Sequence, residues 1–148
     1  QDRIGPQGRI IGVDMTDAML DQARARIAKH GWDNVELIQC DAGDYEFPRD
    51  VNGIISTFAL TLVPQFDDVI RRGANALANG GYWIVADLKM PSNLFRFLYP
   101  LLLPLFRPFG VTLDLADRHP WKSIEKYLRN TTMQEFFLGF TYIASGEK

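Results

Sequence analysis

The chain has 148 residues, of which 47% are hydrophobic and 23% are charged, and its formal net charge is -2. This length is enough for one domain with a hydrophobic core, and the weak negative charge excludes the basic field of a nucleic-acid-binding protein. The single cysteine, Cys40, excludes an internal disulfide framework and a cysteine-rich zinc site, so we expect a reducing, cytoplasmic setting and no metal centre.

The first half of the sequence alternates strand-like and helix-like patterns. Residues 8–14 (GRIIGVD) predict a strand, and a helix is expected from the N-cap Thr16 to about residue 30. Residues 35–41 (VELIQCD) predict a second strand. Residues 52–60 predict a third, apolar on both faces like a central parallel strand.

The second half continues the alternation and then breaks it. A helix is expected from about residue 65 to residue 79, ended by the pair Gly80-Gly81, with a strand over residues 81–88. A short helix is expected to begin at Pro120, and the strand-like residues 133–148 should pair antiparallel at the sheet edge. The order predicts one α/β domain over residues 1–148, with a Rossmann-like, doubly wound, mostly parallel sheet and antiparallel C-terminal edge strands.

Residues 94–109 (LFRFLYPLLLPLFRPF) form a nearly uniform apolar segment within an expected insertion over residues 92–118. Its longest charge-free stretch, residues 97–106, is shorter than the roughly 20 residues of a membrane-spanning helix. Three interpretations stay open: a lid over a lipophilic acceptor, a helix packed on the sheet as core, or a segment in peripheral contact with a membrane surface.

Two acids stand where predicted strands end. Asp14 closes the first strand and Asp41 closes the second. Ligands of open α/β sheets bind beyond the carboxyl ends of the strands, where one acid can accept from ribose hydroxyls and the next from an exocyclic amine such as that of adenine. The alternative is that each aspartate caps a helix or a turn. Two acids on consecutive strands favour a nucleoside site.

Three stretches together resemble class I S-adenosylmethionine (SAM)-dependent methyltransferases. GPQGRIIGVDMTDAMLDQARARI resembles the second-strand region of that family, NVELIQCDAGDYEFP resembles the next strand with its acid, and residues 50–91 resemble the rest of the core. The resemblance implies SAM as cofactor and gives roles to six residues. Asp14 would hold the ribose of SAM, and Met15 would pack on the adenine face. Asp41 would accept a hydrogen bond from the adenine amine, and the Ala42 backbone would meet the ring edge. Thr57 and Phe58 would lie near the methionine and methyl end of the cofactor. Taken alone, Met15 and Phe58 are more typical of core packing.

One family feature is absent from this sequence. Members of the family begin with another strand and a glycine-rich turn of the G-x-G-x-G type, which lets the backbone approach the cofactor. In the family sheet that strand lies between the second and fourth strands. We therefore expect a missing N-terminal segment, or another chain, to supply the strand and the loop.

The resemblance implies methyl transfer to a small acceptor, and the composition of residues 94–109 is similar to that of ubiquinone/menaquinone-biosynthesis methyltransferases. A hydrophobic acceptor site would then be lined by five residues: Phe95, Tyr99, Leu102, Phe106 and Trp121. Positioning supplies much of the catalysis, and a base is needed only if the acceptor loses a proton. The candidates for that base are weak, namely His119 and Tyr99, with Asp114, Asp117 and Tyr142 behind them. The place of His119 directly before Pro120, at an expected helix start, favours a plain surface position over a catalytic one.

Two alternatives belong to other functional classes. A nicotinamide-dependent oxidoreductase also uses an acid on its second strand, but this sequence lacks its glycine loop and the Tyr-x-x-x-Lys pair of short-chain dehydrogenases. A non-catalytic, methyltransferase-like subunit would use residues 94–109 as a protein interface.

Overall fold

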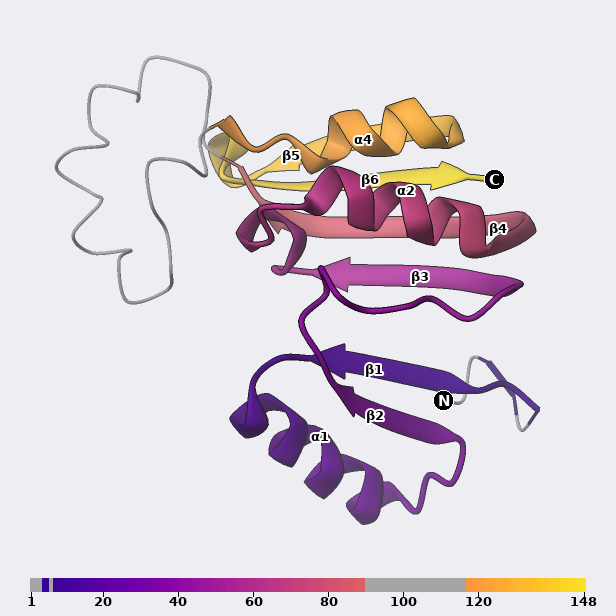
Figure 1. The fold of residues 1–148 in the computed structure, drawn as a ribbon. Helices are drawn as coiled ribbons and strands as arrows, with labels where there is room; N and C mark the ends of the chain where they lie inside the picture. Colours follow the sequence, from indigo (N-terminus) through magenta and orange to yellow (C-terminus); the bar gives the residue numbers. More distant parts are fainter. Residues whose placement is uncertain (1–3, 6, 90–116) are drawn as a thin grey trace, which may run out of the picture. The chain divides into compact units, whose positions relative to one another are not determined.

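The computed structural model describes residues 4–5, 7–89 and 117–148, and it has the mixed α/β architecture expected from the sequence (Figure 1). The chain forms two compact units, residues 1–45 and 46–148. Each unit is described by itself below.

The first unit is a strand-helix-strand motif, as predicted. It consists of β1 (Ile10–Asp14), α1 (Asp17–His30) and β2 (Val35–Gln39). The two strands are parallel and in register from the pair Ile10 and Val35 to the pair Asp14 and Gln39. Because the pairing is parallel, both strands present their carboxyl ends at the same edge of the sheet.

The second unit is a four-stranded sheet with helices. Its elements are, in chain order, β3 (Val51–Thr57), η1 (Leu60–Leu62), α2 (Phe66–Ala76), β4 (Leu77–Leu88), α4 (Pro120–Tyr127), β5 (Arg129–Phe136), η5 (Phe137–Gly139) and β6 (Thr141–Glu147). The strand order is β3-β4-β6-β5, in which β3 and β4 are parallel while β6 is antiparallel to both of its neighbours. The antiparallel C-terminal edge predicted from the sequence is confirmed.

The core of this unit lies between one face of the sheet and the helices α2 and α4, which run along the same side in Figure 1. The most deeply buried side chains are those of Trp83, Val85 and Tyr142 on the strands, packed with Ile70 and Ile124 on the helices. The strands alternate inward and outward residues as a half-buried sheet requires.

The other face of the sheet differs from expectation. Ile55 is 74% exposed, and its register partner Ile84 is 40% exposed. The prediction that residues 52–60 are buried on both faces is therefore wrong for the part of the chain that the structure describes. Only the face with Ile54 packs on the core.

The boundary between α2 and β4 also differs from the prediction. The helix ends at Ala76 and not near residue 79, and β4 begins at once with Leu77, which pairs with Val51. Gly80 has φ 76° and lies inside the strand, where the register with β3 shifts. Gly80 thus allows an irregularity in β4, because glycine adopts positive φ at little cost. The glycine pair does not end the helix.

Four strands of the described sheets, β1, β2, β3 and β5, have an edge that makes no backbone ladder within the described residues. β1 pairs with β2 alone, and β3 pairs with β4 alone. Each strand therefore has one row of backbone N–H and C=O groups outside the two described sheets.

Asp67 joins the two helices of the second unit. Its carboxylate accepts hydrogen bonds from Ser123 Oγ at 2.7 Å, Tyr127 OH at 2.8 Å and Lys126 Nζ at 3.3 Å. The hydrogen bond from Ser123 is the largest cause that holds the pKa of Asp67 below its ordinary value, with Tyr127 and Lys126 adding to it. An ionised Asp67 thus adds hydrogen bonds to the α2–α4 contact, whose buried apolar part includes Ile70 and Ile124.

This arrangement predicts a pH-dependent stability. A carboxyl whose pKa is lower in the folded than in the unfolded state stabilises the fold above its ordinary value of 3.8, and this stabilisation is lost as the pH falls through the lower, folded value. Because Asp67 is exposed on one side, we expect an effect on the order of 1 kcal/mol or less. Urea unfolding from neutral pH to below pH 3.8 should show a smaller loss of stability in Asp67→Asn than in the wild type. Asp44→Asn, an exposed acid of the first unit, is the control. Parallel pH profiles for all three proteins would contradict the prediction.

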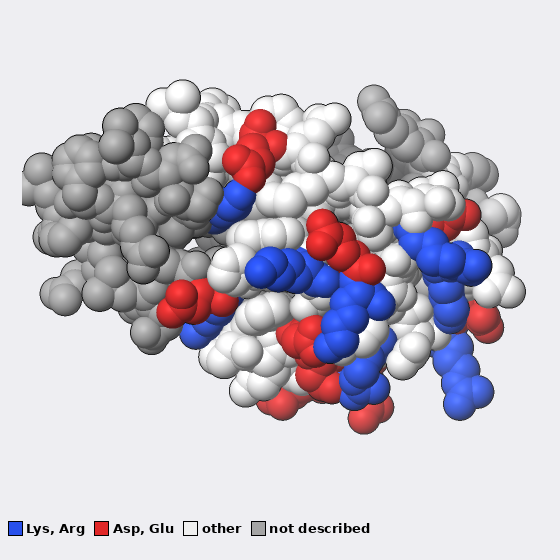
Figure 2. All heavy atoms as spheres, turned by 90° about the horizontal axis from the view of Figure 1, so that it is seen from above, with Lys and Arg blue, Asp and Glu red and all other residues white. Residues whose placement is uncertain are grey.

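Charged side chains of both signs alternate on the face shown in Figure 2. At the surface of α2, Asp68 forms ion pairs with Arg71 and Arg72. This pattern favours a solvated surface over a field of one sign.

Candidate functional site

The two predicted acids lie at the same edge of the first unit. The Cys40 backbone N–H donates to the Asp14 carbonyl at 3.1 Å, which fixes the end of β2 beside the end of β1. Asp14 Oδ1 accepts from the Thr16 N–H at 2.7 Å, and Asp41 Oδ1 accepts from the Gly43 N–H at 2.7 Å. The parallel register places both carboxylates at the carboxyl edge of this sheet.

Each acid is therefore a turn cap through one oxygen. Among the described residues, no hydrogen bond reaches the Oδ2 atom of Asp14 or of Asp41. A carboxylate has about four lone-pair positions, so each side chain is oriented by its own turn and keeps capacity for a ligand. The capping and the ligand-binding interpretations are compatible in this geometry.

Met15 and Ala42 follow the two acids directly. The Met15 side chain is 65% exposed, so core packing, the more usual explanation for a methionine after a strand, is wrong here. Ala42 is half-buried in the turn that Asp41 caps. The first unit thus combines two oriented carboxylates with an exposed, flexible apolar side chain, a set that suits a nucleoside with polar hydroxyls and a flat base.

Thr57 and Phe58 lie in the second unit, at the carboxyl end of β3. Thr57 is exposed, and Phe58 is 58% exposed, so core packing is wrong for Phe58 as well. The Phe58 backbone has φ 50°, a left-handed conformation that is uncommon outside glycine, and its N–H donates to the Ala86 carbonyl at 2.8 Å. The turn after β3 thus presents an aromatic ring to solvent.

A group of aromatic and basic side chains lies between α4 and the sheet of the second unit. The Trp121 ring contacts those of His119 and Tyr142 edge-on, with centroids 4.7 Å and 5.0 Å apart, and Lys89 Nζ lies 5.2 Å from its centroid. Lys89 also forms an ion pair with Glu135. Trp121 therefore supports the cluster through packing, and His119 is the half-buried member at its edge.

The ring of His119 has a defined tautomer when neutral. Its Nδ1 atom lies 2.7 Å from the Asp117 carbonyl oxygen. Because a carbonyl only accepts, Nδ1 carries the proton and Nε2 carries a lone pair. His119 can thus accept a proton at Nε2.

Tyr142 is unsuited to that role. Its hydroxyl is buried and has no hydrogen-bond partner among the described residues. Burial first, and the charge of Asp87 second, raise the pKa of Tyr142 well above its ordinary value, so the phenol keeps its proton near neutral pH.

Several sequence predictions fall on residues 90–116, outside the described residues. These are most of the insertion over residues 92–118 and five individual positions: Phe95, Tyr99, Leu102, Phe106 and Asp114. They remain predictions.

Asp87 was missed at the level of the sequence. It is a third acid near the end of a strand, in GYWIVADL, which is the same signal that drew attention to Asp14 and Asp41. Its carboxylate is buried at 2% exposure beside the turn after β3.

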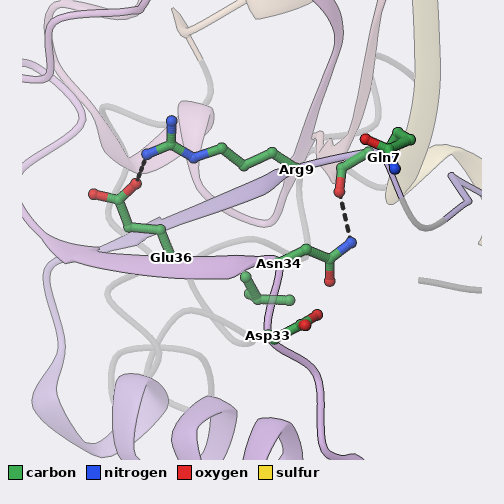
Figure 3. Close-up of a pocket in the computed structure, with 7 residues that line it drawn as sticks. Gln7, Arg9, Asp33, Asn34 and Glu36 are labelled. Atoms are coloured by element: carbon green, nitrogen blue, oxygen red, sulfur yellow. Dashed lines mark hydrogen bonds and ion pairs between the residues drawn. The ribbon is translucent and has the colours of Figure 1, made fainter.

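A hollow of about 400 Å³ lies at the opposite ends of β1 and β2 (Figure 3). There, Arg9 pairs with Glu36, and Asn34 Nδ2 donates to the Gly8 carbonyl at 2.6 Å. The Oδ1 atom of Asn34 is buried and has no hydrogen-bond partner among the described residues. The hollow is at the amino ends of the strands, whereas ligands of open α/β sheets bind beyond the carboxyl ends.

No group of three or more potential ligands could hold a metal ion within the described part of the chain. Of the helices that the structure describes, none has the length and apolar character to cross a bilayer.

The family model of a methyltransferase domain matches residues 1–105 of this chain. The chain belongs to the methyltransferase domain family. The resemblance drawn from the strand ends is thereby confirmed.

Curated relatives extend this assignment. The chain is 28% identical over 152 aligned residues to a demethylmenaquinone methyltransferase of Listeria welshimeri serovar 6b, which covers 96% of the chain and 64% of that protein. It is 27% identical over 135 aligned residues to a ubiquinone/menaquinone biosynthesis C-methyltransferase of Pseudomonas putida (strain GB-1), covering 89% of the chain and 53% of that protein. The chain thus spans between about half and two thirds of the length of these relatives.

Solved structures support the fold. The chain superposes on a geranyl diphosphate C-methyltransferase of Streptomyces coelicolor A3(2), solved with Mg²⁺, geranyl diphosphate and S-adenosyl-L-homocysteine, with a TM-score of 0.68. The superposition covers 94% of the chain and 63% of that protein at 13% identity. At this identity the likeness concerns the fold alone.

Proposed function

We propose that the chain takes part in SAM-dependent methyl transfer to a small hydrophobic acceptor. The observation that carries the proposal is the pair of acids Asp14 and Asp41, each oriented by its own turn at the carboxyl edge of a parallel sheet and each with an oxygen left for a ligand. Membership of the methyltransferase family supports the same conclusion.

The residues of the first unit fit the nucleoside part of the cofactor. Asp14 would accept hydrogen bonds from the ribose hydroxyls, Asp41 would accept one from the adenine amine, and Met15 would cover a face of the base, with Ala42 at the ring edge. When bound, S-adenosylmethionine supplies an electrophilic methyl group on a positively charged sulfur. Thr57 and Phe58 are proposed to contact the methionine end.

We further propose that the acceptor is a reduced quinone or a similarly flat, lipophilic molecule. Both curated relatives are named after a quinone or its biosynthesis. The cluster of Trp121, His119 and Lys89 offers an aromatic surface beside a cation. Transfer to a ring carbon forms a carbon–carbon bond, breaks the carbon–sulfur bond of the cofactor and releases a proton from the acceptor. His119 Nε2 would take up that proton, because its Nδ1 atom is already committed to the Asp117 carbonyl.

The role of His119 predicts a loss of turnover without a loss of cofactor binding. In His119→Gln, kcat with reduced demethylmenaquinone should fall by about 10² to 10⁴, the usual contribution of a general base, while the affinity for S-adenosylhomocysteine stays unchanged. His30→Gln is the matched control, because His30 is the other of the chain's two histidines and stacks on Trp32 in the first unit. Equal kcat values for the two variants would show that His119 is not the general base.

The proposal as a whole is tested by calorimetric titration of the chain with S-adenosylhomocysteine, with NAD as the control ligand. We expect micromolar binding of S-adenosylhomocysteine and none of NAD, because the family assignment favours methyl transfer over nicotinamide chemistry. Binding of NAD alone would overturn the proposal.

A non-catalytic subunit remains the second candidate function. The exposed apolar residues of the sheet face, such as Ile55 and Ile84, favour it, because large exposed apolar side chains mark interaction surfaces. This candidate predicts no binding of either ligand in the titration.

We also propose that the open edges of β1 and β3 pair with another strand, from an N-terminal segment or from another chain. The absence of a second partner for either strand in the described sheets supports this. A 148-residue sample, verified by intact mass, that is monomeric and unfolds in one cooperative step would contradict it.

A further inference from the structure

Asp87 is a buried carboxylate that the proposed reaction leaves without a role. It lies near the end of β4 and is 2% exposed. Its Oδ2 atom accepts from the Thr61 N–H at 2.9 Å, and its Oδ1 atom accepts from the Leu88 N–H at 2.7 Å. Burial raises the pKa of Asp87, in opposition to these hydrogen bonds. Because burying a carboxylate is costly, its presence needs a reason beyond packing.

Thr61, the main partner of Asp87, is held by two further hydrogen bonds. Its Oγ1 donates to the Leu88 carbonyl at 3.2 Å, and its own carbonyl accepts from Arg118 Nη1 at 2.9 Å. Thr61 is itself only 2% exposed. The short helix η1 is thus attached to the end of β4 from one side and to Arg118 from the other.

Phe58 begins the turn that leads to Thr61. Its left-handed φ of 50° costs free energy for a residue with a side chain, and such conformations persist only where the surroundings fix them. The hydrogen bond from its N–H to the Ala86 carbonyl and the attachment of Thr61 three residues later supply that restraint. The ring of Phe58 is nevertheless 58% exposed, so the core does not explain its conformation.

We infer that Asp87 is a positioning residue: through the Thr61 amide it fixes the turn that presents Phe58 at the carboxyl end of β3. The inference rests on the proposed function, in which this turn contacts the methionine end of the cofactor. A small displacement of a group that orients a reactant lowers the rate strongly, even when the mutated residue is remote from the chemistry. Asp87 therefore acts through Phe58 and touches neither reactant.

The test compares Asp87→Asn and Thr61→Val with the wild type. Asparagine matches the shape of aspartate but can accept at only one atom, so one of the two backbone N–H groups loses its acceptor. We expect exchange of the Thr61 amide, followed by NMR in deuterated solvent, to accelerate at least tenfold in Asp87→Asn, while amides of β5 and β6 keep their protection. With reduced demethylmenaquinone, kcat should fall roughly 10- to 100-fold while KM for the acceptor changes less than twofold. Asp68→Asn, an exposed acid on α2, should match the wild type in both measurements.

Thr61→Val keeps the Thr61 amide and removes the hydroxyl, which bonds to the Leu88 carbonyl and also helps to lower the pKa of Asp87. It should fold even if Asp87→Asn does not, and it should lower kcat by a smaller factor than Asp87→Asn. Wild-type exchange of the Thr61 amide in Asp87→Asn would overturn the inference, as would faster exchange with unchanged kcat and unchanged affinity for S-adenosylhomocysteine. A wild type that neither binds this ligand nor methylates the acceptor would refute the proposed function instead, and amide exchange would still show whether Asp87 holds the turn.

Discussion

Replacement of Asp14 by asparagine should abolish most of the affinity for S-adenosylhomocysteine while leaving the fold intact. The Asp14 carboxylate has two tasks in the structure: Oδ1 caps the turn by accepting from the Thr16 N–H, and Oδ2 has no partner among the described residues. Asparagine retains a carbonyl oxygen for the turn but places an NH₂ group, a donor, where Oδ2 stood. The substitution therefore separates capping from ligand binding.

The expected loss is large. Hydrogen bonds to a charged group contribute about 1.5–3 kcal/mol each, which corresponds to roughly 10- to 150-fold in affinity for one ribose hydroxyl. Calorimetry gives the affinity, and urea unfolding should give a stability within about 0.5 kcal/mol of the wild type. Asp14→Ala should lose the affinity and also about 1 kcal/mol of stability, because it removes the cap.

Asp21→Asn is the matched control. Asp21 is an exposed acid of the same unit and pairs only with Arg24 on α1 among the described residues. It should bind S-adenosylhomocysteine as the wild type does. If Asp14→Asn also retains full affinity while Asp14→Ala is merely less stable, Asp14 is a turn cap and nothing more, and the nucleoside site must be sought elsewhere.

Much of the fold could be predicted from the sequence because its signals are local. The helix α1 ends at His30, and the next residue, Gly31, has φ 62° as a C-terminal stop requires. The acids Asp14 and Asp41 lie where the apolar strands β1 and β2 end. Pro120 begins α4 as expected. These features follow from dihedral preferences and periodicity within a few residues.

The errors lie where contacts distant in sequence decide. Leu77 continues the apolar stripe of α2, yet it belongs to β4 because it pairs with Val51 and is 1% exposed there. Exposure of Ile55 could not be foreseen either, since burial of a strand's second face depends on what covers it. The role of Asp87 depends on a hydrogen bond to Thr61, 26 residues away in the sequence, and no local pattern reports such a contact.

Trp83→Ala should be the most destabilising substitution in the second unit. Trp83 is 1% exposed, lies between the sheet and α2, and contacts Phe47 with ring centroids 5.8 Å apart. Replacing a buried tryptophan by alanine costs about 3–5 kcal/mol through lost burial and the cavity that remains. Since domains of this size are stable by about 5–15 kcal/mol, the loss is a large fraction of the total. Urea unfolding followed by far-ultraviolet circular dichroism measures it without relying on the removed fluorophore.

The neighbouring residue provides the control. Tyr82 precedes Trp83 in β4, points to the opposite face and is 49% exposed, so Tyr82→Ala should cost less than about 1 kcal/mol. A similar small cost for both variants would mean that α2 does not pack on this face in solution.

Gly73 allows a sharper test of the same contact. A Cβ atom at Gly73 would lie 2.4 Å from Trp83 Cζ3, so helix and ring can approach only because position 73 carries no side chain. Gly73→Ala should therefore destabilise by about 1–3 kcal/mol through overpacking, although alanine is the better helix former by up to about 1 kcal/mol. In a Trp83→Leu background the penalty should largely disappear, because the atoms that clash are gone. The Trp83 Nε1–H also donates to Ser56 Oγ at 3.0 Å, one residue before Thr57, so the packing that these variants weaken is the packing that holds the end of β3 and the turn with Phe58.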